Sequence, residues 1–184
     1  FEAMDGLLDG MFPCAEDGES PTMQAASLGR RISEQMLASN VVDSFDFLAD
    51  NAPMEALRNR YGFGANPDAL DTPAARAALA AQAITTGFAR VVSLTLGEGF
   101  DTHMDNWWKA HGASQLSCWN AIARLMEHLR STPIGDGSGD TYLDRTTIVA
   151  YSDFSRSPNL NQFSGRDHWL TSCYFLAGAD IRGG

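Results

Sequence analysis

The sequence predicts an α/β layered fold built around a mainly parallel sheet. Two observations carry this prediction: helical and strand-like segments follow one another along the chain, and the strand-like segments are almost continuously apolar. Strands of this kind are buried on both faces by the helices that cover their sheet. Sheets of this class bind ligands beyond the carboxyl ends of their strands, so functional residues are expected at that edge.

The first part of the chain is predicted to be helix and loop. Residues 1–20 are rich in Gly, Asp and Glu and are interpreted as a loop or lid. Apolar residues spaced through 22–48 indicate one or two helices. Pro53 suits the first turn of a helix that leads to Leu57, and the glycines and proline of 61–71 indicate another loop.

Two longer helices are predicted in the remainder. An alanine-rich segment at 74–88 begins after Thr72, a hydroxyl cap, and Pro73, which suits the first helical position. The second helix spans 114–130. Its apolar residues recur at intervals of three and four and are expected to form one buried stripe of Leu116, Trp119, Ile122, Met126 and Leu129.

Three strands are predicted at 90–96, 146–151 and 172–177, where β-branched and aromatic residues form short apolar runs. A glycine- and aspartate-rich loop at 135–140 precedes the second strand. The three strands are expected in one sheet, with the two longer helices packed on its faces. On this interpretation the 184 residues form part of one α/β domain, in which 71–184 is the half that carries the sheet and 1–70 is a helical and loop segment.

Composition narrows the classes of partner. The chain has 13 basic and 23 acidic side chains, giving a net charge of −10, so the basic stripe that binds a nucleic-acid backbone is not expected. No apolar run approaches the roughly 20 residues that cross a bilayer. Cys14, Cys118 and Cys173 are compatible with one disulfide and a free thiol or with three reduced thiols, and their spacing leaves both open.

Polar clusters lie beside all three predicted strands: one after 90–96, one after 146–151 and one before 172–177. Their chemically active members are Asp101 and His103 in the first, Asp153 and Arg156 in the second, and Arg166, Asp167 and His168 in the third.

Divalent-metal binding is the chemistry that these residue types favour. A carboxylate and an imidazole two residues apart reach one ion when the backbone between them is extended or turned. Asp101, His103 and His168 would form a three-ligand site with an open position, as in catalytic zinc centres. Asp153 and Asp167 are candidates for that site or for a second ion.

The arginines of the clusters suit a different role. Arg156 and Arg166 are candidates to bind an anionic substrate through forked hydrogen bonds. Asp167 also has a structural interpretation, because it would pair with Arg166 or cap a turn.

Aromatic and histidine side chains near the clusters leave alternatives open. Trp107 and Trp108 are interpreted as pocket-lining residues or as core or interface residues, as is Trp119. His111 is a candidate outer-shell group of the site. His128 lies off the apolar stripe of its helix, and it is expected to be solvated and to have no functional role.

The same segments, in order, resemble a bacterial family catalogued as domain of unknown function 1501, whose members are often exported through the twin-arginine route. The resemblance runs from about residue 80 to 184. It rests on residues 82–83, 87–92, 99–103, 144–149, 152–158, 161, 165–169 and 176–178.

That family is similar to the alkaline phosphatase and sulfatase superfamily. The resemblance therefore implies a partial α/β/α sandwich with one or two metal ions at the carboxyl edge of its sheet. Asp101 and His103 look like one ligand pair, His168 like the late histidine ligand of the same ion, and Asp153 like a ligand of the neighbouring ion. The implied metal is zinc in the first place, with calcium or manganese as alternatives.

The resemblance implies a metal-dependent hydrolase of phosphate or sulfate esters that is periplasmic or otherwise exported. The superfamily's nucleophile belongs to a region that this sequence does not visibly contain, so the chain is interpreted as part of a longer polypeptide. The alternative is a non-catalytic exported scaffold, or a subunit of a surface assembly, that keeps the fold and a structural metal. The expected partners are accordingly a small anionic ester, a protein, or the remainder of the chain itself.

Overall fold

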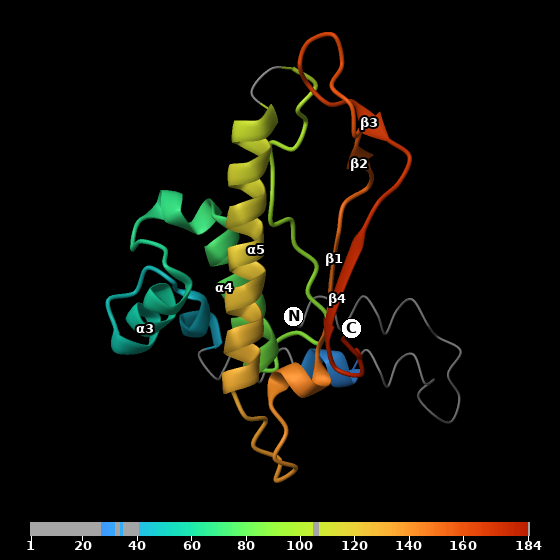
Figure 1. The fold of residues 1–184 in the computed structure, drawn as a ribbon. Coiled ribbons are helices and arrows are strands. Elements are labelled where there is room, and N and C mark those ends of the chain that lie inside the picture. The colour runs from blue at the N-terminus through green and yellow to red at the C-terminus, as the bar shows by residue number, and fades with distance from the viewer. Residues whose placement is uncertain (1–26, 32–33, 35–40, 105–106, 184) are drawn as a thin grey trace, which may run out of the picture. The chain divides into compact units, whose positions relative to one another are not determined.

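The computed structural model describes residues 27–31, 34, 41–104 and 107–183 (Figure 1). The chain forms two compact units, Phe1–Asp43 and Ser44–Gly184. In the first unit, residues 27–31 are helical, within the segment that the sequence predicts to contain helix. The loop expected at 1–20, with Cys14, lies outside the described residues. A short 3-10 helix, η1 (Val41–Phe45), spans the boundary, and the other elements belong to the second unit.

Helix α3 (Ala52–Tyr61) begins and ends where local signals place its limits. The Asn51 side chain accepts a hydrogen bond from the Met54 backbone N–H at 3.0 Å, and Pro53 lies in the first turn. Gly62 ends the helix in the left-handed conformation, with φ of 73°, which glycine adopts without steric cost. The predicted helix through Leu57 is confirmed.

Helix α4 (Pro73–Thr85) follows the 3-10 helix η2 (Pro67–Asp71). Thr72 Oγ1 accepts from the Ala75 N–H at 3.3 Å, which confirms the predicted cap, with Pro73 at the first position. Most of the alanines of this helix are buried, and their small side chains allow a neighbouring helix to approach closely. The buried members are Ala75, Ala77, Ala78, Ala80, Ala81 and Ala83.

Helix α5 (Trp107–Ser131) begins earlier than the sequence predicts. Its apolar stripe is buried in the second half, where Ile122 is 6% and Leu129 is 0% exposed. In the first half the expected burial is wrong, because Leu116 is 64% and Trp119 is 46% exposed. The core cluster meets α5 only from Ala121 onward, so Leu116 and Trp119, on the earlier turns, lie outside it.

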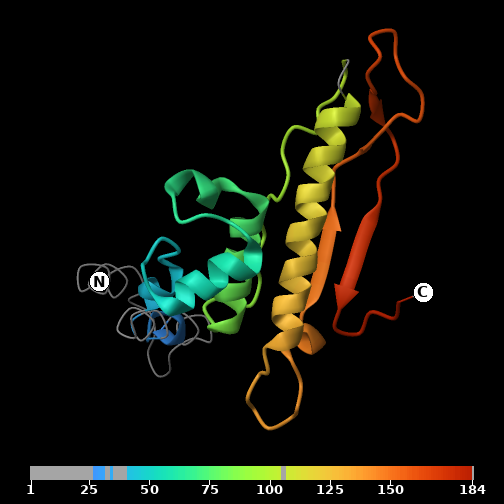
Figure 2. The ribbon, with the colours of Figure 1, turned by 60° about the vertical axis from the view of Figure 1, so that its left-hand side comes forward.

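The core of the second unit lies between α3, α4 and the second half of α5. Figures 1 and 2 both show α3 and α4 on one side of α5 and the strands β1 and β4 on the other. The buried cluster consists of Phe47, Met54, Leu57, Tyr61, Ala77, Ala78, Ala80, Ala81, Ala121, Leu125, Leu129 and Leu143.

Two small sheets follow α5 and the 3-10 helix η3 (Tyr142–Arg145). Strand β1 (Thr147–Tyr151) pairs antiparallel with β4 (Tyr174–Gly178), with Val149 opposite Leu176. Strand β2 (Ser155–Arg156) pairs antiparallel with β3 (His168–Trp169). The strands predicted at 146–151 and 172–177 are therefore present. No parallel pair occurs among the described strands, and the α/β/α sandwich with a mainly parallel sheet stays a prediction.

The strand predicted at 90–96 is not formed in the structure. Val92, Leu94 and Leu96 pack against the core while the residues between them are more exposed, so the segment alternates as a strand would. It is assigned no strand, because it has no ladder partner within the described part of the chain. The apolar run was interpreted as a buried strand, but burial against the core does not by itself supply a neighbouring strand.

Candidate metal centre

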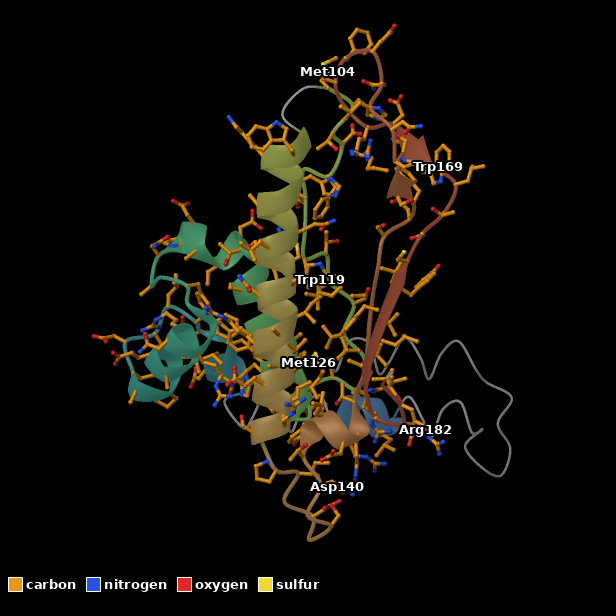
Figure 3. All side chains as sticks on the ribbon, viewed as in Figure 1. Met104, Trp119, Met126, Asp140, Trp169 and Arg182 are labelled. Atoms are coloured by element: carbon orange, nitrogen blue, oxygen red, sulfur yellow. The ribbon has the colours of Figure 1, made fainter. Side chains whose placement is uncertain are left out.

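Asp101, His103 and His168 converge on one point near the N-terminal end of α5. Figure 3 shows this end of the molecule, marked by the labels Met104 and Trp169. His103 Nε2 lies 3.0 Å from His168 Nε2 and 3.0 Å from Asp101 Oδ1, and His168 Nε2 lies 3.8 Å from Asp101 Oδ1. Residues far apart in the sequence thus bring three ligand-type atoms together.

The dimensions of this triangle fit a single tetrahedral ion. Two ligands bonded to zinc at about 2.0–2.1 Å and separated by the tetrahedral angle lie about 3.3 Å apart. The three observed separations fall on both sides of that value. Zinc takes imidazole nitrogen and carboxylate oxygen as ligands, so both the donor set and its geometry fit this metal.

Arg156 supports the carboxylate of the triangle. It lies on β2, directly opposite His168 of β3, and its side chain is only 12% exposed. Its Nη2 donates to Asp101 Oδ1 at 2.8 Å, and its Nη1 donates to the Arg166 carbonyl at 3.2 Å. The hydrogen bond from Arg156 is the main reason that the pKa of Asp101 is lowered, and the nearby His103 and His168 lower it further.

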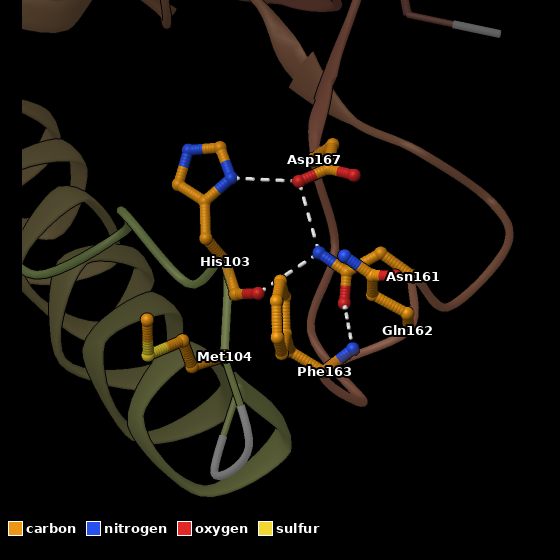
Figure 4. Close-up of a pocket in the computed structure, with 6 residues that line it drawn as sticks. All are labelled: His103, Met104, Asn161, Gln162, Phe163 and Asp167. Carbon is orange, nitrogen blue, oxygen red and sulfur yellow. Dashed lines mark hydrogen bonds and ion pairs between the residues drawn. The ribbon is translucent and has the colours of Figure 1, made fainter.

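Asp167 lies on the other side of the His103 ring (Figure 4). Its Oδ1 is 2.8 Å from His103 Nδ1 and accepts from Asn161 Nδ2 at 2.9 Å. The hydrogen bond with His103, followed by that with Asn161, lowers the pKa of Asp167. Asp167 therefore contacts a candidate ligand from behind and does not belong to the triangle itself.

Three residues before β3, Asn161, Gly165 and Arg166, contact the backbone around His103, and we call this set of contacts the clasp. The Arg166 N–H donates to the Thr102 carbonyl at 2.9 Å, and Asn161 Nδ2 donates to the His103 carbonyl at 2.9 Å. A Cβ on Gly165 would lie 2.0 Å from the His103 carbonyl carbon, so only glycine fits this approach. The clasp fixes the position of His103 relative to His168.

The remaining predicted site residues lie outside the triangle. Asp153 is exposed and its carboxylate accepts from the adjacent Phe154 N–H at 2.9 Å. Arg166 Nη1 donates to the carbonyls of Ser157 and Pro158. The centroid of the Phe154 ring lies 4.0 Å from that of the His168 ring, so Phe154 packs against this imidazole.

The other two histidines, His111 and His128, each contact an aromatic side chain away from the triangle. His111 is half-buried against the Phe100 ring, and burial is the main cause of its lowered pKa. His128 accepts or donates a hydrogen bond at Nδ1 with the buried Tyr61 hydroxyl at 3.1 Å, and burial lowers its pKa too. The expectation that His128 is solvated is wrong, because α3 covers it through Tyr61.

Among the described side chains, no tryptophan or cysteine adds a ligand to the triangle. Trp108 is exposed beside Lys109, and Trp119 packs edge-on against Phe175 of β4 at 5.3 Å. The Trp107 side chain is outside the described residues. Cys118 and Cys173 are both free thiols in the structure.

An open pocket of about 440 Å³ adjoins the centre on the Asp167 side of His103 (Figure 4). Its lining residues are His103, Met104, Asn161, Gln162, Phe163 and Asp167. Asp101 and His168 are not among them, so the pocket borders the outer side of the cluster rather than the centre of the triangle.

Asn161, Gly165 and Asp167 are the residues of this site whose roles sequence reasoning missed. Asn161 and Gly165 belong to the segments that carried the family resemblance, which marked them without giving a role. Because Asp167 adjoins His168 in the sequence, it could be expected near the metal site. Its contact with His103 could not, because that contact depends on the clasp between distant segments.

The fold and the centre define a chain with a candidate three-ligand metal site beside a long helix. A family model described as "Protein of unknown function (DUF1501)" matches residues 15–184, and the chain belongs to this family. No curated protein and no solved structure is significantly similar to the chain. Among the described residues, no helix combines the length and the apolar character needed to cross a membrane.

Proposed function

We propose that Asp101, His103 and His168 hold one divalent metal ion, zinc in the first place, with calcium or manganese as alternatives. We further propose that the metal serves a hydrolase of phosphate or sulfate esters. The observation that supports the metal is the triangle of ligand-type atoms separated by 3.0, 3.0 and 3.8 Å. Three protein ligands leave a fourth position of a tetrahedral ion open, which is typical of catalytic zinc.

The hydrogen-bonding character of the facing ligand atoms also favours a bound metal ion. In the tautomer whose Nδ1 proton faces Asp167, His103 has an acceptor lone pair at Nε2. The Asp101 oxygen 3.0 Å from that nitrogen is also an acceptor. Two acceptors at this distance repel each other unless a cation or a proton lies between them. A bound metal would replace this repulsion by two coordinate bonds.

A bound divalent ion would polarise an ester oxygen and lower the pKa of a coordinated hydroxyl group. The residues of the chain would orient that chemistry. Arg156 holds the Asp101 carboxylate, and Phe154 supports the face of the His168 ring. The proposed substrate is a small anionic ester, and the proposed location is periplasmic or exported, both by family resemblance.

The second candidate function is a non-catalytic exported scaffold with a structural metal. The scaffold function is favoured because the two candidate anion-binding arginines donate hydrogen bonds to acceptors within the protein. Arg156 donates to Asp101 and to the Arg166 carbonyl, and Arg166 donates to two further carbonyls. Donors that are committed to protein acceptors are less available to a substrate anion. Ester turnover therefore has to be measured separately from metal binding.

The test combines metal analysis with a screen of p-nitrophenyl phosphate and p-nitrophenyl sulfate. The wild-type chain and His168→Ala are compared, with Asp180→Asn as a control because Asp180 is exposed in the turn after β4. About one zinc per chain with turnover, both lost in His168→Ala, supports the hydrolase. Metal without turnover supports the scaffold. Zinc content equal in the wild type and His168→Ala would contradict both.

A further inference from the structure

Two neighbouring residues contact the His103 ring from opposite sides. Asp167 Oδ1 lies 2.8 Å from Nδ1, and His168 Nε2 lies 3.0 Å from Nε2. The chain around Asp167 and His168 thus reaches both nitrogens of one imidazole. The triangle uses the Nε2 side, which leaves the contact at Nδ1 without a role in ligation.

Asn161 holds the Asp167 carboxylate in this position. Its Nδ2 donates to Asp167 Oδ1 and to the His103 carbonyl, both at 2.9 Å. Its Oδ1 accepts from the backbone N–H groups of Phe163 and Gly165 at 2.9 and 3.0 Å. Every polar atom of the Asn161 amide is therefore engaged, and the carboxylate is fixed relative to the backbone that carries His103.

A neutral imidazole carries its proton on either nitrogen, and the partner of one nitrogen decides which. A carboxylate accepts hydrogen bonds and donates none when ionised, so it selects the form protonated at the nitrogen that faces it. Carboxylates placed in this way behind a ligating histidine orient the ring and increase its basicity toward the metal.

We propose that Asp167, held by Asn161, is a positioning residue that keeps the proton of His103 on Nδ1 and thereby presents the Nε2 lone pair to the metal. The inference rests on the proposed metal centre. Its first consequence, the position of the proton, belongs to the metal-free protein and can be measured there. Its second consequence is tighter binding of the ion, because no tautomer change or ring rotation precedes ligation.

The test uses Asp167→Asn, which keeps the size of the side chain but adds an N–H donor that can face Nδ1. Asp167→Glu restores a carboxylate, and Asp180→Asn is the matched control on an exposed turn. The first readout is the ¹⁵N–¹H correlation spectrum of the His103 ring in metal-free protein, recorded at a pH where its signals are those of the neutral form. The second is the zinc dissociation constant from competition with a chromophoric chelator.

The expected wild-type spectrum is that of the Nδ1–H tautomer, and Asp167→Asn should shift the ring toward the Nε2–H form. Zinc affinity should fall 10–100-fold in Asp167→Asn, recover in part in Asp167→Glu and stay unchanged in Asp180→Asn. An Nε2–H tautomer in the wild type, or one that Asp167→Asn does not change, would overturn the positioning role. A wild type with the Nδ1–H tautomer and no zinc binding would instead contradict the metal centre alone.

Discussion

The Nε2 atoms of His103 and His168 lie 3.0 Å apart, although 64 residues separate the two histidines in the sequence. His103 reaches this point on an irregular segment that precedes α5, and His168 reaches it on β3. The clasp by Asn161, Gly165 and Arg166 joins these two segments through the Asn161 side chain, the Arg166 N–H and the close approach of Gly165 to the His103 backbone. The geometry of the candidate centre therefore depends on the clasp as much as on the ligands.

Gly165→Ala tests this dependence. The added Cβ would lie 2.0 Å from the His103 carbonyl carbon and 2.1 Å from its oxygen, so the two segments must separate. We expect a loss of about 1–3 kcal/mol in the free energy of unfolding, as for other overpacked sites. Zinc affinity should fall as well, because His103 and His168 move apart. Urea unfolding and chelator competition measure the two effects.

Gly112→Ala is the matched control for that substitution. Gly112 lies in α5, is exposed, and has no heavy atom within 4 Å of an added Cβ. Replacing a helical glycine by alanine should stabilise the fold by about 0.5–1 kcal/mol. Equal effects of the two substitutions on stability or on zinc affinity would show that the clasp does not position the site.

Arg156→Ala should raise the pKa of Asp101 toward its ordinary value of about 3.9. The reason is that the Arg156 hydrogen bond stabilises the charged carboxylate and is the largest cause of its lowered pKa. Arg156→Lys should give a smaller rise, because a charge remains without the planar fork. Carboxyl ¹³C NMR titration of Asp101 measures the pKa in each variant.

Arg145→Ala is the control for Asp101, because Arg145 pairs with Asp136 and Asp140 instead. It should leave the pKa of Asp101 unchanged. If Arg156→Ala moves the Asp101 pKa no more than Arg145→Ala does, Arg156 does not support the candidate ligand. Its role would then be limited to its hydrogen bond with the Arg166 carbonyl.

The loop between α5 and η3 should make stability depend on pH in the acid range. Hydrogen bonds from Ser138, with a further contribution from Arg145, lower the pKa of Asp136 to about 2. In the unfolded chain this carboxyl should titrate near 3.9. Because the folded pKa is the lower one, the charged carboxylate stabilises the fold above about pH 4, and this contribution disappears as the pH falls toward 2.

Urea unfolding of the wild type and Asp136→Asn between pH 2 and 7 measures this contribution. The difference in unfolding free energy should be largest above pH 4 and shrink steadily as the pH falls to 2. Asp180→Asn provides a matched exposed control without these partners. A difference between wild type and Asp136→Asn that is the same at every pH would show that the charge of Asp136 does not stabilise the loop.

The starts of α3 and α4 could be predicted from sequence because capping is local, whereas α5 begins earlier than predicted. Thr72 and Pro73 define the start of α4 within three residues of chain, and no distant contact is needed to interpret them. The strands β1 and β4 were recognisable for a similar reason. Their antiparallel direction was not, because an apolar run indicates a strand without showing which way its neighbour runs.

The three residues of the triangle were predicted from residue type and from family resemblance, and the structure brings them together. The partners behind them were not predicted, because their contacts join segments that lie far apart in sequence. Asp167 was expected to join a metal site or to pair with its neighbour Arg166, yet its carboxylate contacts His103. Arg156 was expected to face a substrate, yet it donates to Asp101.

The measurement that tests the central claim most directly is zinc K-edge X-ray absorption of the metal-loaded protein. The proposed centre predicts two imidazole nitrogens and one protein carboxylate oxygen at about 2.0–2.2 Å, with a further light atom in the open position. One imidazole should disappear in His103→Ala and one in His168→Ala. Sulfur at about 2.3 Å, or an imidazole count that neither substitution changes, would contradict the assignment of Asp101, His103 and His168 as the metal ligands.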